Sequence, residues 1–83
     1  MSYALDIDPI AQEQIAALPQ PALVALAEAF SVLEIVPWSG LSLNERNPDA
    51  EVRQLPFGDF GMITYLVLED LRRVDVLIVT WAR

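Results

Sequence analysis

The chain has 83 residues, of which 54% are hydrophobic, and a formal net charge of −7 with five arginines and no lysine. This length suits one domain spanning residues 1–83, and no apolar run approaches the ~20 residues that cross a bilayer. Cys and His are absent, which excludes disulfides, thiolate metal sites and the usual general base near neutral pH. No P-loop or dinucleotide fingerprint appears either, so we expect no metal and no cofactor.

The beginning of the chain lacks the basic stretch and apolar segment of a signal peptide, so we expect a soluble, cytoplasmic protein. Residues 3–7 alternate apolar and polar side chains, which predicts a half-buried strand. Asp8-Pro9 then predicts a helix start, because the carboxylate can cap the first turn and proline suits the first helical position. Pro19 ends this helix.

A second helix is predicted over residues 21–36, and it is unusually apolar. One wide stripe faces the expected core: Leu23, Leu26, Ala27, Phe30, Leu33 and Val36. Val24, Val32 and Ile35 extend beyond that stripe. Such a helix either has its additional apolar residues covered by loops or presents an apolar face to another chain.

The second half of the chain predicts a loop and then a sheet. Pro37 to Gly40 stops the helix, and residues 41–50 have loop composition. Three strands follow, joined by tight turns at 58–61 and 70–72: residues 51–57, 62–69 and 73–81. Pro56 places the first of them at a sheet edge or frays it. The other two are apolar on both faces, which places them in the middle of the sheet.

The order β-α-α-β-β-β predicts an α+β fold, with a two-helix hairpin packed on one face of a small curved antiparallel sheet. The first strand is expected to join the sheet after the helical crossover.

Hairpin geometry brings candidate functional residues opposite one another. With the first turn centred near Asp59, Arg53 faces Tyr65. With the second centred at residues 70–71, Tyr65 faces Leu77. This pairing determines which side chains share a face, because a one-residue slip reverses them.

In this register Arg53, Tyr65 and Trp81 share one face, and Arg83 follows the last strand. We expect an arginine and aromatic patch on the face away from, or beside, the helices. Such a patch could hold RNA, because arginine binds phosphate oxygens and aromatic rings stack on bases. The alternative is a cross-strand cation–aromatic pair beside a core tryptophan.

The charge distribution leaves two interpretations open. Acidity can simply keep a small apolar domain soluble, and a free chain this acidic is expected to be repelled by nucleic acid. Alternatively, the four arginines on or beside the predicted sheet form a local basic spot. Arg72 and Arg73, in the second turn, are expected to be solvated.

Taken in order, these elements resemble the RelE/ParE superfamily of bacterial type II toxins. The similarity covers nearly the whole chain and includes the following segments: Asp8-Pro9-x-Ala11, Leu33-x-x-x-Pro37-x-x-Gly40, Val52-Arg53-x-Leu55, the spacing from Gly61 to Tyr65 that leads into Tyr65-Leu-Val-Leu-Glu-Asp, and the strand from Arg73 to Val79.

The resemblance implies a small toxin that a cognate antitoxin wraps and holds inactive. RelE-like members cut mRNA on the ribosome, whereas ParE-like members poison DNA gyrase. RNA cleavage needs a proton acceptor, a proton donor and positive charge near the phosphorane. By resemblance, Arg53 matches the family arginine on the second strand. Arg53 and Arg83 would contact phosphate, and Tyr65 would be the proton-transfer candidate.

Two departures from the family pattern keep a second hypothesis open. The chain has no lysine, and Gly61-Met62 stands where the family often has an arginine leading into the next strand. These departures and the surplus of apolar residues favour a non-catalytic interaction domain with the same fold. Its partner would be another protein or a second copy of the chain, bound through the helix at residues 21–36 or an exposed sheet edge.

Overall fold

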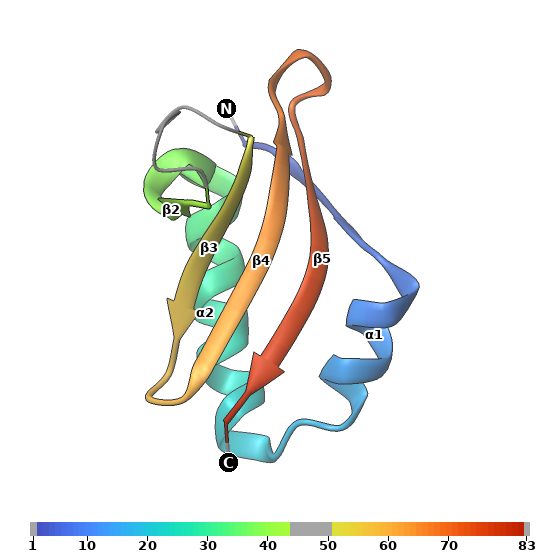
Figure 1. Ribbon diagram of the computed structural model, residues 1–83, viewed down its shortest axis with the longest axis vertical. Helices are drawn as coiled ribbons and strands as arrows, with labels where there is room; N and C mark the ends of the chain where they lie inside the picture. The colour runs from blue at the N-terminus through green and yellow to red at the C-terminus, as the bar shows by residue number, and fades with distance from the viewer. Residues whose placement is uncertain (1, 44–50, 83) are drawn as a thin grey trace.

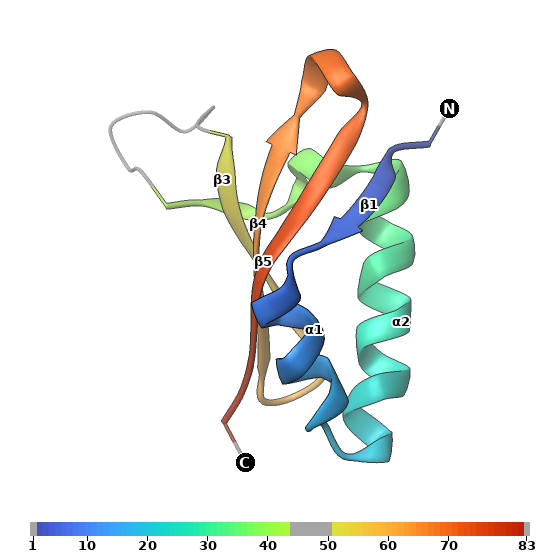
Figure 2. The same ribbon diagram turned by 90° about the vertical axis from the view of Figure 1, so that its right-hand side faces the viewer.

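The computed structural model describes residues 2–43 and 51–82, and over these residues two helices lie on one side of a five-stranded sheet (Figures 1 and 2). The elements follow the predicted order with one short additional strand, β2. They are β1 (Ala4–Ile7), α1 (Pro9–Ala16), α2 (Gln20–Ile35), the 3-10 turn η1 (Pro37–Ser39), β2 (Leu41–Ser42), β3 (Val52–Phe57), β4 (Gly61–Leu68), the 3-10 turn η2 (Glu69–Leu71) and β5 (Arg73–Trp81).

The sheet has the strand order β1-β5-β4-β3-β2 and is mixed. Strands β3, β4 and β5 form the expected antiparallel meander. Strand β1, however, runs parallel to β5, with Leu5 opposite Val74 and Ile7 opposite Val76. The antiparallel expectation was therefore wrong at this one edge. Here α1, α2 and the meander provide the long connection that a parallel pair needs.

Local sequence accounts for the start of α1. The Asp8 side chain accepts a hydrogen bond from the Ile10 backbone N–H at 2.9 Å, and Pro9 occupies the first turn. The cap satisfies one of the free N–H groups at the helix start. The helix ends at Ala16, slightly before the predicted stop at Pro19.

Helix α2 packs on the sheet through a different face from the predicted stripe, of which Leu26 and Leu33 are buried while Ala27 and Val36 are exposed. Its buried residues recur at helical spacing and include two alanines: Ala22, Leu26, Ala29 and Leu33. Small side chains let the helix approach the strands closely. A stripe chosen for its large apolar residues does not reveal these alanine contacts. Neither helix among the described residues has the length and apolar character that a membrane span requires.

The loops that the structure describes do not cover the additional apolar residues of α2. Val24, Val32 and Ile35 are 56%, 40% and 67% exposed. Of the two interpretations of this helix, burial of the extra residues under loops was therefore wrong.

The strand register is confirmed between β3 and β4 and shifted between β4 and β5. Arg53 lies opposite Tyr65 as predicted. Tyr65, however, lies opposite Val76, while Thr64 lies opposite Ile78. Leu77 is thus an extra residue in β5, a β-bulge that turn position alone does not predict.

Pro56 marks an open edge of the sheet, as expected. It pairs with Met62 of β4, whereas the described part of β2 covers β3 only at Arg53 and Gln54. Proline has no N–H to offer to another strand, so it protects this edge from unwanted pairing.

The α2 packing face can be tested by a matched pair of truncations. Replacing the fully buried Leu33 by Ala should cost about 2–5 kcal/mol of unfolding free energy. Ile35→Ala, on the exposed side of the same helix, should change it by about 0.5 kcal/mol or less. Urea denaturation measures both, and equal losses would show that the assigned face is wrong.

Candidate functional site

Tyr65 is fully buried on the helix-facing side of the sheet, beneath η1. Its hydroxyl donates to the Pro37 carbonyl at 2.7 Å and accepts from the Gly40 N–H at 3.1 Å. Burial is the main cause that raises the pKa of Tyr65. Position 40 has no room for a side chain, because a Cβ there would meet the Tyr65 hydroxyl and lie 2.7 Å from the Gln54 carbonyl oxygen. The hydroxyl therefore ties the η1 segment to β4, and its role in proton transfer stays a prediction.

Arg53 lies beside this anchor and is 9% exposed. Its Nε donates to the Gly40 carbonyl at 3.0 Å. Its guanidinium carbon lies 5.3 Å from the centroid of the Trp38 ring. The cation–aromatic partner of Arg53 that the structure shows is thus Trp38 of η1, rather than Tyr65 across the strands.

Trp81 lies away from these two residues. It shares their face, as predicted, but it pairs with Gly61 at the other end of β4, about 13 Å from Tyr65 at roughly 3.3 Å per residue. There it packs against Phe57 and Phe60, with ring centroids 5.6 and 5.8 Å apart.

The predicted arginine and aromatic patch is therefore divided between the two ends of the sheet. Its face is also the one that the helices cover, rather than the face away from them. Arg83 lies outside the described residues.

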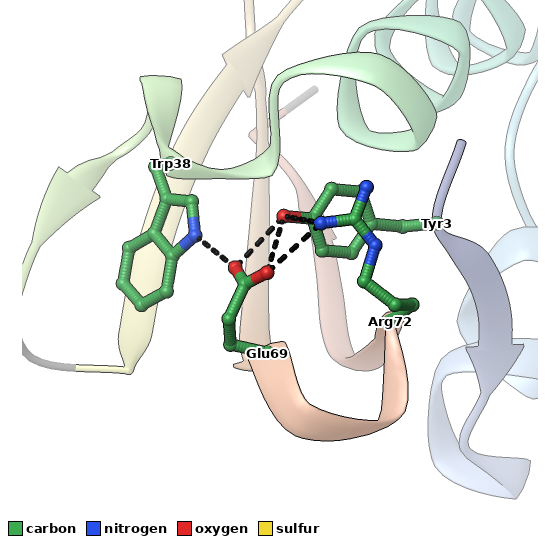
Figure 3. A network of polar contacts seen from close by, with 4 residues as sticks. All are labelled: Tyr3, Trp38, Glu69 and Arg72. Carbon is green, nitrogen blue, oxygen red and sulfur yellow. Dashed lines mark hydrogen bonds and ion pairs between the residues drawn. The ribbon is translucent and has the colours of Figure 1, made fainter. Parts of the chain in front are cut away.

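A second polar cluster, which we call the Glu69 cluster, adjoins Trp38 and comprises Tyr3, Trp38, Glu69 and Arg72 (Figure 3). Glu69 Oε1 accepts from the Tyr3 hydroxyl at 2.7 Å and from Trp38 Nε1 at 2.8 Å. Glu69 Oε2 accepts from the Tyr3 hydroxyl at 2.9 Å and pairs with Arg72 Nη1 at 3.0 Å. Donors from the N-terminal segment, η1 and the β4–β5 turn thus converge on one carboxylate.

Backbone geometry brings Glu69 and Arg72 together. Arg72 has a left-handed conformation with φ of 49°, and its N–H donates to the Glu69 carbonyl at 3.0 Å. This closes the turn and places the two side chains on the same side. The Arg72 guanidinium also stacks on Tyr3, with its central carbon 4.2 Å from the ring centroid.

These contacts change the acidity of both partners in the cluster. The hydrogen bond from Trp38 and then the one from Tyr3 lower the pKa of Glu69, because they favour its charged form. The hydrogen bond to Glu69 is the main cause that raises the pKa of Tyr3. The cluster therefore holds Glu69 as an anion and Tyr3 as a neutral donor.

Arg72 and Arg73 are paired with carboxylates, although the sequence predicted solvated side chains. Arg73 Nε lies 2.7 Å from Asp75 Oδ1, and this hydrogen bond raises the pKa of Arg73. Asp6 of β1 lies opposite Asp75 of β5, and its carboxylate adds negative charge around Arg73. The described arginines of this turn therefore do not form a basic spot.

Sequence reasoning missed Tyr3, Trp38 and Glu69. The spacing of Glu69 and Arg72 within one turn was an available signal for an ion pair. No local pattern marks Tyr3 and Trp38, because they lie 66 and 31 residues from Glu69.

Chemically, the Glu69 cluster is an arrangement of donors around an anion. The described residues contain no group of acidic side chains suited to a metal ion. Beside the cluster lies a hollow of about 430 Å³, lined by Glu51, Leu68, Glu69, Asp70 and Leu71.

Comparison with known proteins gives structural likeness only: no family model and no curated protein matches the sequence. A chain of the RelBE2 toxin–antitoxin complex from Mycobacterium tuberculosis aligns with a TM-score of 0.81 at 20% identity, over 98% of this chain and 92% of that chain. A free Escherichia coli RelE toxin with two arginine-to-alanine substitutions aligns with a TM-score of 0.80 at 17% identity, over 100% and 86%. The intact E. coli RelBE complex gives 0.75 at 20% identity, over 98% of each chain.

These values show that the chain has the fold of RelE toxins, so the predicted RelE/ParE-like fold is confirmed. At identities near 20%, the likeness concerns the fold and not the activity.

The buried anchor predicts a stability cost for Tyr65→Phe. The substitution leaves the Pro37 carbonyl and Gly40 N–H without their partner, which should lower the unfolding free energy by about 1–3 kcal/mol. Thr80→Val removes an exposed hydroxyl from the same sheet, with its long 3.4 Å hydrogen bond to the Met62 carbonyl, and should cost about 0.5 kcal/mol or less. Equal values in urea denaturation would contradict the anchoring role.

The lowered pKa of Glu69 predicts a pH dependence of stability. A carboxyl whose pKa is lower in the folded state stabilises the protein above its unfolded pKa, and this contribution is lost as pH falls through the folded pKa. The stability advantage of the wild type over Glu69→Gln should therefore be constant near neutral pH and shrink below about pH 5. Thermal melts of both proteins from pH 7 to pH 3 measure this difference, and one that stayed constant throughout would rule out the lowered pKa.

Proposed function

We propose that this protein is the toxin component of a type II toxin–antitoxin pair, acting in the cytoplasm as one domain and neutralised by a cognate antitoxin. The observation that carries the proposal is the alignment, over 98% of this chain, with chains solved in complexes of toxin and antitoxin. A fold alone supports many activities, so the target is argued separately from the site.

The finer proposal is cleavage of mRNA at the ribosome, with Arg53 and Arg83 contacting phosphate and Tyr65 transferring a proton. Its support is the position of Arg53 against Trp38, which is 38% exposed. An arginine beside an accessible indole suits a phosphate next to a stacked base. For Tyr65 to act, its hydroxyl has to leave Pro37 and Gly40.

A second candidate is a non-catalytic interaction domain with the same fold. The pairing of Arg72 with Glu69 and of Arg73 with Asp75 favours it, because paired arginines offer less positive charge to RNA. The exposed apolar residues of α2 also suit contact with a protein partner.

Induced expression in bacteria tests the toxin proposal. The wild type should arrest growth, and co-expression of an antitoxin from a neighbouring gene should restore it. Arg53→Ala should relieve the arrest at least about tenfold in plating efficiency, as loss of a single charged contact does for catalysis. Arg73→Ala removes the same charge on the open face of the sheet and should leave the arrest unchanged.

Circular dichroism of each purified variant separates lost activity from lost folding. A wild type that binds the antitoxin without arresting growth would support the interaction domain instead. A wild type that neither arrests growth nor binds the antitoxin would overturn the toxin proposal.

A further inference from the structure

The Glu69 cluster has the composition of an anion-binding site that is already filled. Hydrogen-bond donors of three different kinds point at one position: a phenol hydroxyl, an indole N–H and a guanidinium (Figure 3). Both carboxylate oxygens of Glu69 are engaged, each by two of these contacts. Charge-assisted hydrogen bonds of this kind are the stronger ones in proteins.

We infer that Tyr3, Trp38 and Arg72 form an oxyanion site whose internal occupant is Glu69, and that a small phosphate-bearing ligand takes the same position when Glu69 moves out. This inference goes beyond the proposed toxin function and holds whether or not the protein arrests growth.

Two of the three donors, Tyr3 and Trp38, have anchors outside the Glu69 cluster. The Tyr3 N–H donates to the Glu34 carbonyl at 2.7 Å, and the Tyr3 side chain is 8% exposed. Trp38 belongs to η1, whose Pro37 carbonyl accepts from the buried Tyr65 hydroxyl. Because these anchors lie outside the cluster, removing Glu69 should leave Tyr3 and Trp38 in place and preorganised for an anion.

Arg72 is held by Tyr3 as well as by Glu69. Its guanidinium lies over the Tyr3 ring, and its Nη1 donates to the Tyr3 hydroxyl at 3.1 Å. The Arg72 carbonyl also accepts from the Ala4 N–H at 2.9 Å, which links the turn to β1. Arg72 therefore keeps its orientation when the carboxylate leaves.

Glu69, in contrast, has space into which it can rotate once its contacts with the donors break. Its side chain is 47% exposed, and the residue begins η2 just after the last residue of β4. Rotation of the side chain breaks no strand pairing. The adjoining hollow of about 430 Å³, which Glu69 itself lines, gives the carboxylate space to move into.

Charge favours a small phosphate over other anions. An external ligand competes with a tethered carboxylate, which has a high effective concentration. A phosphate monoester carries roughly −1.5 to −2 at pH 7 and three acceptor oxygens, so it interacts more strongly with Arg72 than a carboxylate does. The net charge of −7 opposes a long polyanion, so a small ligand is favoured over a polynucleotide.

The test follows the two tryptophan indole N–H signals by nitrogen-15 NMR during titration with inorganic phosphate. Trp38 reports on the site, and Trp81 is an internal control because it packs with Phe57 and Phe60 at the other end of the sheet. If Glu69 fills the site about nine-tenths of the time, Glu69→Ala should bind phosphate about tenfold more tightly than the wild type.

Two double variants provide the matched comparison. Glu69→Ala with Arg72→Ala should lose the saturable Trp38 shift, whereas Glu69→Ala with Arg73→Ala should keep it. If Glu69→Ala is poorly folded by its spectrum, Glu69→Ser and the wild type at higher phosphate concentration are used in its place. The inference is wrong if phosphate shifts the Trp38 signal in neither the wild type nor Glu69→Ala. It is also wrong if phosphate shifts the Trp38 and Trp81 signals alike.

Further titrations of Glu69→Ala separate the ligand classes. A nucleoside monophosphate that binds at least as well as inorganic phosphate supports a small phosphate-bearing ligand. A single-stranded RNA that binds more than tenfold better than either would overturn that assignment in favour of a polynucleotide. Acetate binding as tightly as phosphate would overturn the preference for phosphate.

Discussion

One buried hydroxyl organises the part of the molecule where function is proposed. Tyr65, at the centre of the sheet, bonds to Pro37 and Gly40 on either side of Trp38. Trp38 in turn lies against Arg53 and donates to Glu69. The positions of Arg53 and Glu69 around Trp38 therefore depend on how the Tyr65 hydroxyl holds η1. In a low-dielectric interior such a bond is costly to lose, which makes it an effective anchor.

The net charge of the chain and the local charge at one end of the sheet differ. The chain is strongly acidic, yet its described arginines lie at one end of the sheet around Trp38 and the β4–β5 turn. Carboxylates neutralise Arg72 and Arg73, and Arg53 is nearly buried. Recognition of an anion at this end therefore depends on local displacement of a carboxylate rather than on long-range attraction, which the net charge opposes.

The surface of α2 bears on the proposal that this chain binds a protein partner. Chains with this fold have been solved in complexes with RelB antitoxins. Here the outer side of α2 exposes large apolar side chains, and proline protects the free edge of β3. A partner that covers this helix would remove apolar surface from water, which is the main driving force of protein association.

Periodicity and turn residues in the sequence determined the order of the elements, the edge at Pro56 and the pairing of Arg53 with Tyr65, because each depends on neighbours within one hairpin or helix. Only the tertiary structure decided that β1 runs parallel to β5, that Leu77 is a bulge and that Arg53 and Tyr65 face the helices. It also brought Tyr3 and Trp38 to Glu69. These features arise where the helices close over the sheet and join segments that have no local pattern in common.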